Sequence, residues 1–286
     1  MKKTVLFEKL GFFSLGLAGL LVLSVLIWII GDIFVHGASV ISWEFLTQSP
    51  REGMTQGGIL PAIIGTFLVS LITIILAVPL GMFSAIYLNE YAHQGPLVRF
   101  IRLSIRNLSG VPSIVYGLFG VALFVRFFHL GASILSAGMT LGLLTLPWTI
   151  TASEEALKTV PKSFRDGALA LGATKWQAIR TNVLPYAIPG MLTGAILGLA
   201  RAAGETAPIL FTGAAFFVPF LPKSLFDQFM ALPYHLYILA TQHQDIARVR
   251  PIAYGTGLVL IALIIGLNGI AVFIRYQYRK KARMAS

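Results

Sequence analysis

The sequence predicts an all-α polytopic membrane protein with six transmembrane helices and both termini in the cytoplasm. The first observation is composition, because 56% of the 286 residues are hydrophobic and only 12% are charged, which excludes an ordinary soluble domain. The second is that apolar runs long enough to cross a bilayer recur along the chain. The third is an uneven distribution of basic residues between alternate loops, which sets the orientation.

Six apolar stretches have the length of a membrane span. We expect these spans at residues 11–35, 58–88, 108–127, 132–152, 187–212 and 252–274. The first is too long for the apolar region of a signal peptide, so we expect a retained helix, peripheral to a core of about 58–275. Pro79 should bend the second span, and a tight turn at 129–131 should precede the fourth. The chain 1–286 is therefore predicted to be one transmembrane domain.

Basic residues are concentrated on one side of this topology. Sixteen of the 22 lie in the N-terminal segment, in the loops 89–107 and 153–185, and in the C-terminal tail. Five lie in the opposite loops, and Arg201 lies within the fifth span. Because cytoplasmic loops carry the excess of lysine and arginine, both termini are predicted to be cytoplasmic. The excess of basic residues in the cytoplasmic loops thus accounts for the net charge of +11, and no nucleic-acid partner is expected.

The residue inventory excludes several kinds of site. The chain has no cysteine, which excludes disulfides and thiolate metal sites. Its five histidines are scattered without the spacing of metal ligands. No Gly-x-x-x-x-Gly-Lys-Ser/Thr phosphate loop occurs in the sequence, so the chain does not bind ATP by that device. We expect no metal, no cofactor and no enzymatic activity in this chain.

An arginine and a glutamate lie well inside the fifth span. A charge at mid-membrane costs about 2.5–3.5 kcal/mol, so Arg201 and Glu205 are candidates for a functional pathway. Their i,i+4 spacing places both on one helical face, where they partly neutralise each other. Close packing of this face on another helix is predicted by a ridge of small residues, Gly190, Gly194, Gly198 and Ala202. The alternative is an ion pair that only joins two helices.

The cytoplasmic segment 153–185 is predicted to form two short helices. Ser163, with Asp166 three residues later, is an N-cap pattern, and Gly172 is placed to end the helix. Thr174 and Gln177 form a capping-box pattern that begins the second helix. Such an amphipathic projection either packs on itself, lies on lipid or docks a partner.

This segment resembles the EAA loop of the permeases of ABC importers, whose consensus is Glu-Ala-Ala, three residues, Gly, nine residues, Ile-x-Leu-Pro. The matching positions are Asp-Gly-Ala at 166–168, Gly172, and Asn-Val-Leu-Pro at 182–185, with departures at Asp166, Gly167 and Asn182. The resemblance implies the type I importer permease fold and a coupling helix seated in a cleft of an ATPase subunit. The residues that it assigns to coupling are Ser163, Phe164, Asp166, Gly167, Ala168, Leu171, Gly172 and Ala173.

Two further stretches resemble phosphate-importer permeases, the second especially the PstA-type subunit. They are Gly-Val-Pro-Ser-Ile-Val-Tyr-Gly-Leu-Phe-Gly at 110–120 and Arg-Ala-Ala-Gly-Glu-Thr-Ala-Pro-Ile-Leu-Phe-Thr at 201–212. The resemblance implies a bacterial inner-membrane protein that imports inorganic phosphate by alternating access. The implied partners are a homologous sister permease, two ATPase subunits that bind ATP and magnesium, an extracytoplasmic phosphate-binding protein and membrane lipid. Permeases for molybdate, sulfate or phosphonate share the coupling loop and stay alternatives.

The chemistry of the fifth span suits an oxyanion substrate. A guanidinium offers phosphate oxygens a planar fork that is always protonated, and Glu205 would hold Arg201 when no anion is bound. Thr206, Ser113 and Tyr116 are further candidates for the substrate pathway. For Ser113 the alternative is a bond to backbone freed by a proline, and for Tyr116 it is helix packing. The rival classes are an ion-coupled carrier, with Glu205 carrying a proton, and a membrane scaffold.

The outer segment 214–250 is long and rich in aromatic residues. Short helices are expected at 224–231 and 234–242, separated by Pro233. One interpretation is that these helices lie on the membrane surface. The other, implied by the family, is a platform for the phosphate-binding protein.

Overall fold

The computed structural model describes residues 2–284, with side chains over residues 8–278. Its long helices are α1 (Lys2–Ala38), α3 (Leu60–Ile86), α6 (Ile134–Lys158), α9 (Leu184–Gly204) and α12 (Ile246–Met284). The shorter helices are α2 (Trp43–Thr47), α4 (Pro96–Leu108), α5 (Ser113–Gly120), α7 (Lys162–Ala170), α8 (Lys175–Ala178), α10 (Ala207–Thr212) and α11 (Leu232–Thr241). Two-residue strands β1 (Pro50–Arg51) and β2 (Gln56–Gly57) pair antiparallel. Basic residues of the tail beyond residue 278 lie outside the described side chains.

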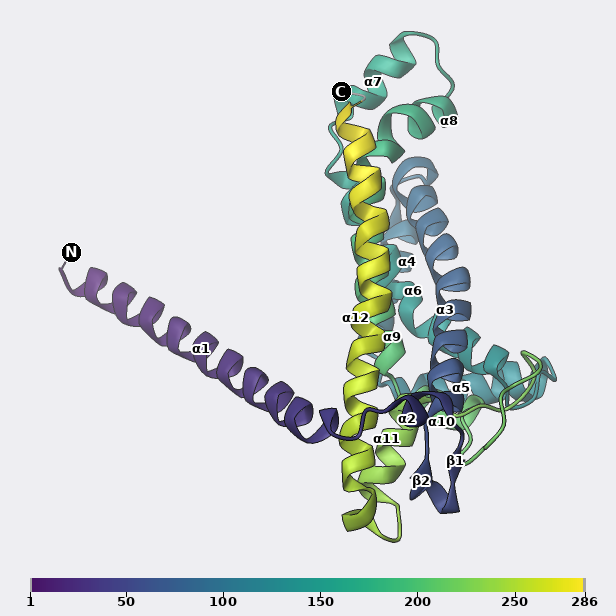
Figure 1. The fold of residues 1–286 in the computed structure, drawn as a ribbon. Coiled ribbons are helices and arrows are strands. Elements are labelled where there is room, and N and C mark those ends of the chain that lie inside the picture. Colours follow the sequence, from purple (N-terminus) through teal and green to yellow (C-terminus); the bar gives the residue numbers. More distant parts are fainter. Residues whose placement is uncertain (1, 285–286) are drawn as a thin grey trace.

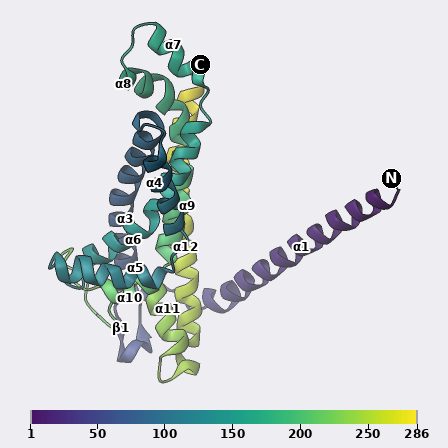
Figure 2. The same cartoon turned by 180° about the vertical axis from the view of Figure 1, so that it is seen from behind.

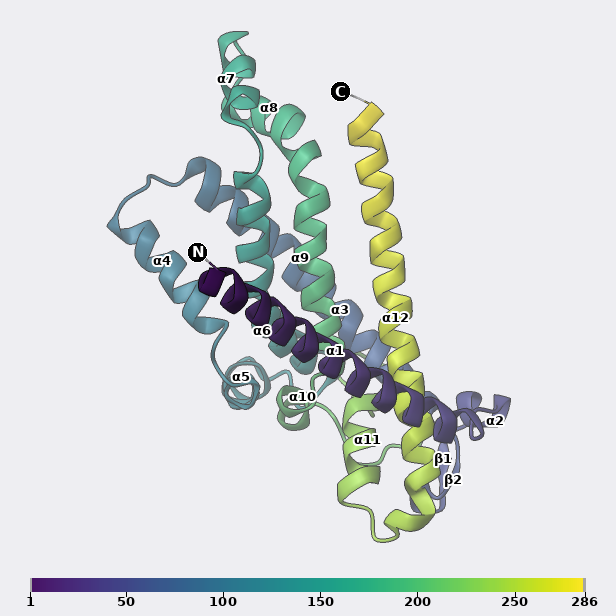
Figure 3. The same ribbon diagram turned by 90° about the vertical axis from the view of Figure 1, so that its left-hand side faces the viewer.

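The helices α3, α6, α9 and α12 run side by side as the central bundle (Figures 1 and 2). Helices α7 and α8 project beyond one end of this bundle, and α2, the β-hairpin and α11 gather at the other end (Figure 1). The distribution of basic residues makes the α7–α8 end cytoplasmic. Helix α1 meets α12 near the outer end and diverges from the bundle (Figure 1), so that it crosses in front of the bundle in the view of Figure 3. The α1 span is not buried against the rest of the described chain.

Among the described residues, five helices are long and apolar enough to cross a membrane, and a bent pair makes six if its two helices form one span. The pair consists of α4 and the segment Ser113–Phe127, which meet at an angle of 103°. The prediction of one span at 108–127 and of a loop at 89–107 was therefore wrong. The physical reason is the sequence Ser-Gly-Val-Pro at 109–112, because Pro112 lacks an amide hydrogen and disfavours helix in the residue before it.

The fifth span is also broken, contrary to the continuous helix predicted for 187–212. Helix α9 ends at Gly204, Glu205 has an extended backbone (φ −74°, ψ 135°), and α10 begins two residues later. Pro208 accounts for the break, because its ring would clash with the carbonyl of Gly204 in a continuous helix and it has no amide hydrogen to donate. The result places a charged residue where the backbone leaves helical geometry.

The predicted small-residue ridge packs on α6, which confirms that part of the prediction. A Cβ added to Gly190 would lie 2.8 Å from Ala156 Cβ, and one added to Gly194 would overlap Ala152. One turn later, a Cβ on Gly198 would lie 3.6 Å from Thr149 Oγ1. Helices without bulky side chains can approach closely and gain contact along their backbones, which drives association in a membrane.

Replacing Gly194 by alanine is therefore expected to destabilise the bundle, by about 1–3 kcal/mol from overpacking. The matched control is Gly198→Ala, one turn along the same helix, where the added methyl meets only an ordinary contact. Thermal unfolding of the detergent-solubilised protein checks this, with a lower midpoint for the first variant only. Adding Ala152→Gly to Gly194→Ala should restore the midpoint, and equal midpoints for the two single variants would contradict the packing described here.

The outer segment differs in part from its prediction. Helix α11 covers most of the predicted 234–242, but 224–231 is not helical and is a turn closed by Asp227. The Asp227 carboxylate accepts hydrogen bonds from the amides of Lys223 (2.8 Å) and Ser224 (2.9 Å), which competes with helix formation. On α11, His235 is 2% exposed, and burial lowers its pKa to about 4. This histidine is therefore an uncharged part of the core at neutral pH.

Candidate functional site: a charged pair at a helix break

Arg201 and Glu205 contact each other across the break between α9 and α10. Arg201 Nε lies 3.3 Å from Glu205 Oε1. Arg201 is in the last turn of α9, where a cation interacts favourably with the helix dipole, and Glu205 follows the last helical residue. The predicted pairing is therefore present, but the predicted shared helical face is not. The two side chains are 44% and 16% exposed, so the guanidinium is open on the surface of this chain and is not sealed in a helix seam.

Trp148 on α6 forms the second contact of the guanidinium. The Arg201 Cζ atom lies 5.6 Å from the centroid of the Trp148 ring, within the range of a cation–π interaction. The indole is 44% exposed and its ring lies beneath the guanidinium carbon, while Glu205 contacts Nε. Sequence reasoning missed Trp148. The residue lies on α6 and Arg201 on α9, and no local pattern in either helix indicates that the two side chains meet.

The bend between α4 and α5 lies next to this break. A Cβ on Gly117 of α5 would lie only 3.0 Å from the Cα of Pro208 on α10, so the two discontinuous helices touch. The Tyr116 hydroxyl donates a hydrogen bond of 3.0 Å to the Leu108 carbonyl at the end of α4, which also accepts from the Val111 amide at 3.1 Å. Tyr116 is 9% exposed and therefore stabilises the bend, and its place in a substrate pathway stays a prediction.

Ser113 and Thr206 occupy corresponding positions at the two breaks. Ser113 is the first residue of α5, and Thr206 directly precedes α10. Both residues are half-buried, and neither hydroxyl has a hydrogen-bond partner among the side chains and backbone that the structure describes. The bond from Ser113 to freed backbone is thus not seen, and the pathway roles of both residues stay predictions.

The cytoplasmic projection has the two predicted helices, α7 and α8. Gly172 follows the end of α7 with φ +83°, a backbone conformation that favours glycine. Both hydrogen bonds of the capping box between Thr174 and Gln177 are present at the start of α8. The predicted N-cap at Ser163 was wrong, because α7 begins directly after Pro161, and Ser163 lies inside the helix. Proline fixes its own φ and removes a donor that a helix start does not need, so it displaces the serine from the cap.

The residues assigned to ATPase coupling divide into an inner and an outer set. Phe164 packs edge-to-face on Tyr186, with ring centroids 4.7 Å apart, and Ala168 is buried. Leu171 is 91% exposed at the tip of the projection. The other exposed or half-buried members are Ser163, Asp166, Gly167, Gly172 and Ala173. The inner set attaches the projection to the bundle, and the outer set is free to meet another protein.

A buried ion pair, which sequence reasoning missed, anchors this projection. Arg165 Nη2 lies 2.6 Å from Glu90 Oε1, and its Nε bonds both carboxylate oxygens at 3.1 and 3.0 Å. Arg165 also donates to the carbonyls of Leu157 (3.0 Å) and Val160 (2.9 Å) at the end of α6. The two side chains are 19% and 6% exposed, so the pair is largely shielded from water. The two residues are 75 positions apart in the sequence, so no local pattern predicts that they pair.

A second ion pair fastens α4 to α6 nearby. Arg102 Nε lies 2.6 Å from Glu154 Oε1, with side chains 20% and 7% exposed. Arg102 also donates to the carbonyl of Leu88 at 3.0 Å, just after α3. Together the two arginines join the cytoplasmic ends of α3, α4, α6 and α7. A displacement of α7 would therefore act on helices that are held together.

Comparisons with known proteins agree with this architecture. A permease of a probable ABC transporter, YqgI of Bacillus subtilis, is 31% identical over 96% of this chain and 97% of its own length. The phosphate transport permease PstA of Mycobacterium leprae is 35% identical, over 90% of this chain and 84% of its own. Among solved structures, a bacterial importer of the polysaccharide alginate matches with a TM-score of 0.64 at 14% identity, covering 91% of this chain and 95% of that chain.

The methionine ABC transporter MetNI in an inward-facing form matches with a TM-score of 0.56 at 16% identity, over 79% of this chain and 94% of that chain. Such identities support the fold alone. The family model that describes the inner-membrane component of binding-protein-dependent transport systems matches residues 77–283. This match includes the broken helices, the charged pair and the cytoplasmic projection, and the chain therefore belongs to that family of multi-pass inner-membrane transport components.

Proposed function

We propose that this protein is the transmembrane permease subunit of an ATP-driven importer of inorganic phosphate. The observation that carries the proposal is a half-exposed guanidinium at a helix break within the membrane, held by Glu205 and Trp148. The similarity to the phosphate permease PstA of Mycobacterium leprae supports phosphate as the substrate. Phosphate is a tetrahedral oxyanion that the guanidinium fork binds with two parallel charge-assisted hydrogen bonds.

The geometry allows Arg201 to exchange one anionic partner for another. In the empty state Glu205 compensates the guanidinium, so no unpaired charge stays in a low-dielectric region. An arriving phosphate takes the exposed edge of Arg201, while Trp148 keeps the plane of the cation fixed. Glu205 then competes with the bound anion, which keeps the binding weak enough for release into the cell.

The cytoplasmic projection supplies the connection to ATP hydrolysis in this proposal. Two ATPase subunits with bound ATP and magnesium would act on the complex, and one would receive α7 and the exposed Leu171. The helical segment Lys175–Gly204 runs without a gap from the projection into the membrane, a length of about 45 Å at 1.5 Å per residue. A displacement of α7 and α8 is thereby carried to Arg201 at the far end of α9.

Two further partners complete the proposed importer. A homologous sister permease would close the pathway on the open side of Arg201, and an extracytoplasmic phosphate-binding protein would deliver the substrate to the outer segment 214–250. The exposed apolar side chains near Arg201, among them Trp148 (44%) and Leu197 (66%), are consistent with a protein neighbour on that face.

Replacing Leu171 by aspartate is expected to reduce the amount of ATPase subunit that copurifies with the complex by about tenfold or more, because burial of the new carboxylate in an apolar cleft is unfavourable. Thr181→Asp is the matched control, since it adds the same charge to an exposed position of the same cytoplasmic segment. Copurification from membranes measures the effect. Equal loss in both variants would indicate a general charge effect and would remove Leu171 from the docking surface.

The experiment that tests the function is uptake of radioactive phosphate into right-side-out or reconstituted vesicles that hold the complete complex and enclose ATP. We expect uptake that requires ATP and persists when an uncoupler collapses the proton gradient. Uptake that stops with the uncoupler would instead favour an ion-coupled carrier. Strong competition by sulfate or molybdate, with little transport of phosphate, would assign the permease to another oxyanion.

A further inference from the structure

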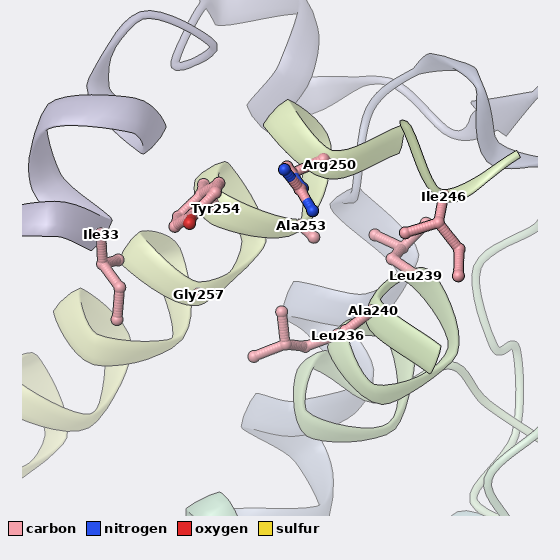
Figure 4. Close-up of a pocket in the computed structure, with 9 residues that line it drawn as sticks. All are labelled: Ile33, Leu236, Leu239, Ala240, Ile246, Arg250, Ala253, Tyr254 and Gly257. Carbon is pink, nitrogen blue, oxygen red and sulfur yellow. The ribbon is translucent and has the colours of Figure 1, made fainter. Parts of the chain in front are cut away.

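A cleft of about 280 Å³ lies at the outer end of α12, apart from the charged pair. Figure 4 shows Arg250 and Tyr254, one turn apart on α12, facing Leu236 and Leu239 of α11, with Ile33 of α1 at the far side. The remaining lining residues, Ala240, Ile246, Ala253 and Gly257, are also apolar. The cleft thus has a hydrocarbon interior with two polar groups.

The guanidinium in this cleft is not neutralised by the surrounding protein. Among the described side chains, Arg250 has no carboxylate within 4.0 Å and donates no hydrogen bond. Asp32 on α1 is paired with His36, whose Nδ1 lies 3.1 Å from the Asp32 carboxylate, and its carboxylate also interacts with the Tyr254 hydroxyl. An uncompensated cation beside an apolar cleft favours an anionic group as the missing partner.

The position of the cleft determines which anion can reach it. Arg250 is four residues from the outer start of α12, and the helix continues through the membrane from there, which places its side chain at the level of lipid headgroups. Helix α1 diverges from α12 next to the cleft (Figure 1), so the apolar walls face the bilayer and not a water-filled pathway. An arginine near an anionic bilayer surface gains about 1 kcal/mol from the lipid headgroups.

We propose that this cleft binds an anionic phospholipid of the outer leaflet. Its phosphate accepts from the Arg250 guanidinium, and an acyl chain lies along Leu236, Leu239 and Ile33. A free phosphate ion would leave the apolar walls exposed to water, whereas a lipid covers them and satisfies the cation together. The bound lipid fills the wedge where α1 leaves the bundle and so stabilises the junction of α1, α11 and α12.

The test measures the lipids that remain bound to the assembled complex. The complex is purified in mild detergent after exchange into bilayers of phosphatidylglycerol and phosphatidylcholine in equal amounts, and bound lipid is quantified by mass spectrometry. We expect phosphatidylglycerol to be retained, and Arg250→Gln to lower its retention about fivefold, as loss of about one lysine or arginine contact predicts. Arg248→Gln is the matched control, because Arg248 lies two residues away on α12 and does not line this cleft.

Three further measurements keep the proposal falsifiable. Arg250→Lys keeps the charge and should restore most of the retention, which distinguishes lipid binding from a folding defect. Displacement of the phosphatidylglycerol by inorganic phosphate in the wash would show a site for free anions and overturn the proposal. A photoreactive side chain in place of Leu236 should label lipid, and labelling of a neighbouring protein helix would assign the cleft to a partner chain instead. Equal retention by wild type and Arg250→Gln would also overturn it.

Discussion

Replacing Arg201 by glutamine should reduce phosphate uptake by about 100-fold while the complex still assembles. A charge-assisted hydrogen-bond pair is worth about 1.5–3 kcal/mol, and each 1.4 kcal/mol is a factor of ten. Assembly should persist, because Arg201 is 44% exposed and its loss leaves Glu205 close to the open surface. Uptake into vesicles with the complete complex, compared with copurification of its subunits, measures the two effects separately.

Two variants refine this prediction. Arg201→Lys keeps the charge but loses the planar fork and the face that stacks on Trp148, so it should recover only part of the uptake. Arg126→Gln removes the same charge from the end of the helical segment Ser113–Phe127 and should transport normally. Full uptake by Arg201→Gln would show that the charged pair only joins helices, and the proposed pathway would then be wrong.

Replacing Glu90 by alanine should detach the cytoplasmic projection from the bundle and lower the free energy of unfolding by about 3 kcal/mol. Removing one member of a shielded ion pair leaves the other charge without compensation, which costs about 3–5 kcal/mol. Arg165 would lose all three of its short contacts to the Glu90 carboxylate and keep only its bonds to backbone carbonyls. Thermal unfolding measures the loss of stability, and ATP hydrolysis without phosphate uptake would reveal the loss of coupling.

The control for Glu90 is a surface ion pair of the same kind. Glu155 lies 2.9 Å from Lys158, and both side chains are well exposed, at 58% and 41%. Glu155→Ala should therefore change stability by less than about 1 kcal/mol and leave coupling intact. If the two variants behave alike, the Glu90–Arg165 pair does not transmit force from the projection to the membrane helices.

Two discontinuous helices meet beside the charged pair of Arg201 and Glu205. A break in a membrane helix leaves backbone groups without their usual partners, and such groups are tolerated only where protein or water can satisfy them. At the first break the Leu108 carbonyl accepts from the Val111 amide and the Tyr116 hydroxyl, and at the second the Glu205 amide donates to the Ala202 carbonyl. Because Gly117 allows α5 to pack directly on Pro208, a movement of either helix displaces the other.

Much of this architecture is local and can be predicted from the sequence. The apolar lengths of α1, α3, α6 and α12, the small residues that face α6, and the caps at Gly172 and Thr174 depend on neighbouring residues alone. The prediction that Arg201 and Glu205 pair is also local, since four residues separate them. The breaks near Pro112 and Pro208 could also be predicted locally, because proline interrupts a helix. They were missed because the residues around each proline form one uninterrupted apolar stretch.

The tertiary structure, and not the local sequence, sets which distant side chains meet. Trp148 reaches Arg201 from another helix, Arg165 reaches Glu90 across 75 residues, and Arg250 comes to lie beside α11 and α1. Each of these contacts depends on the crossing of helices, which is set by the summed packing of many small and apolar residues and not by any motif. The charges and four of the six spans follow from the local sequence, whereas helix packing sets which partners those charges have.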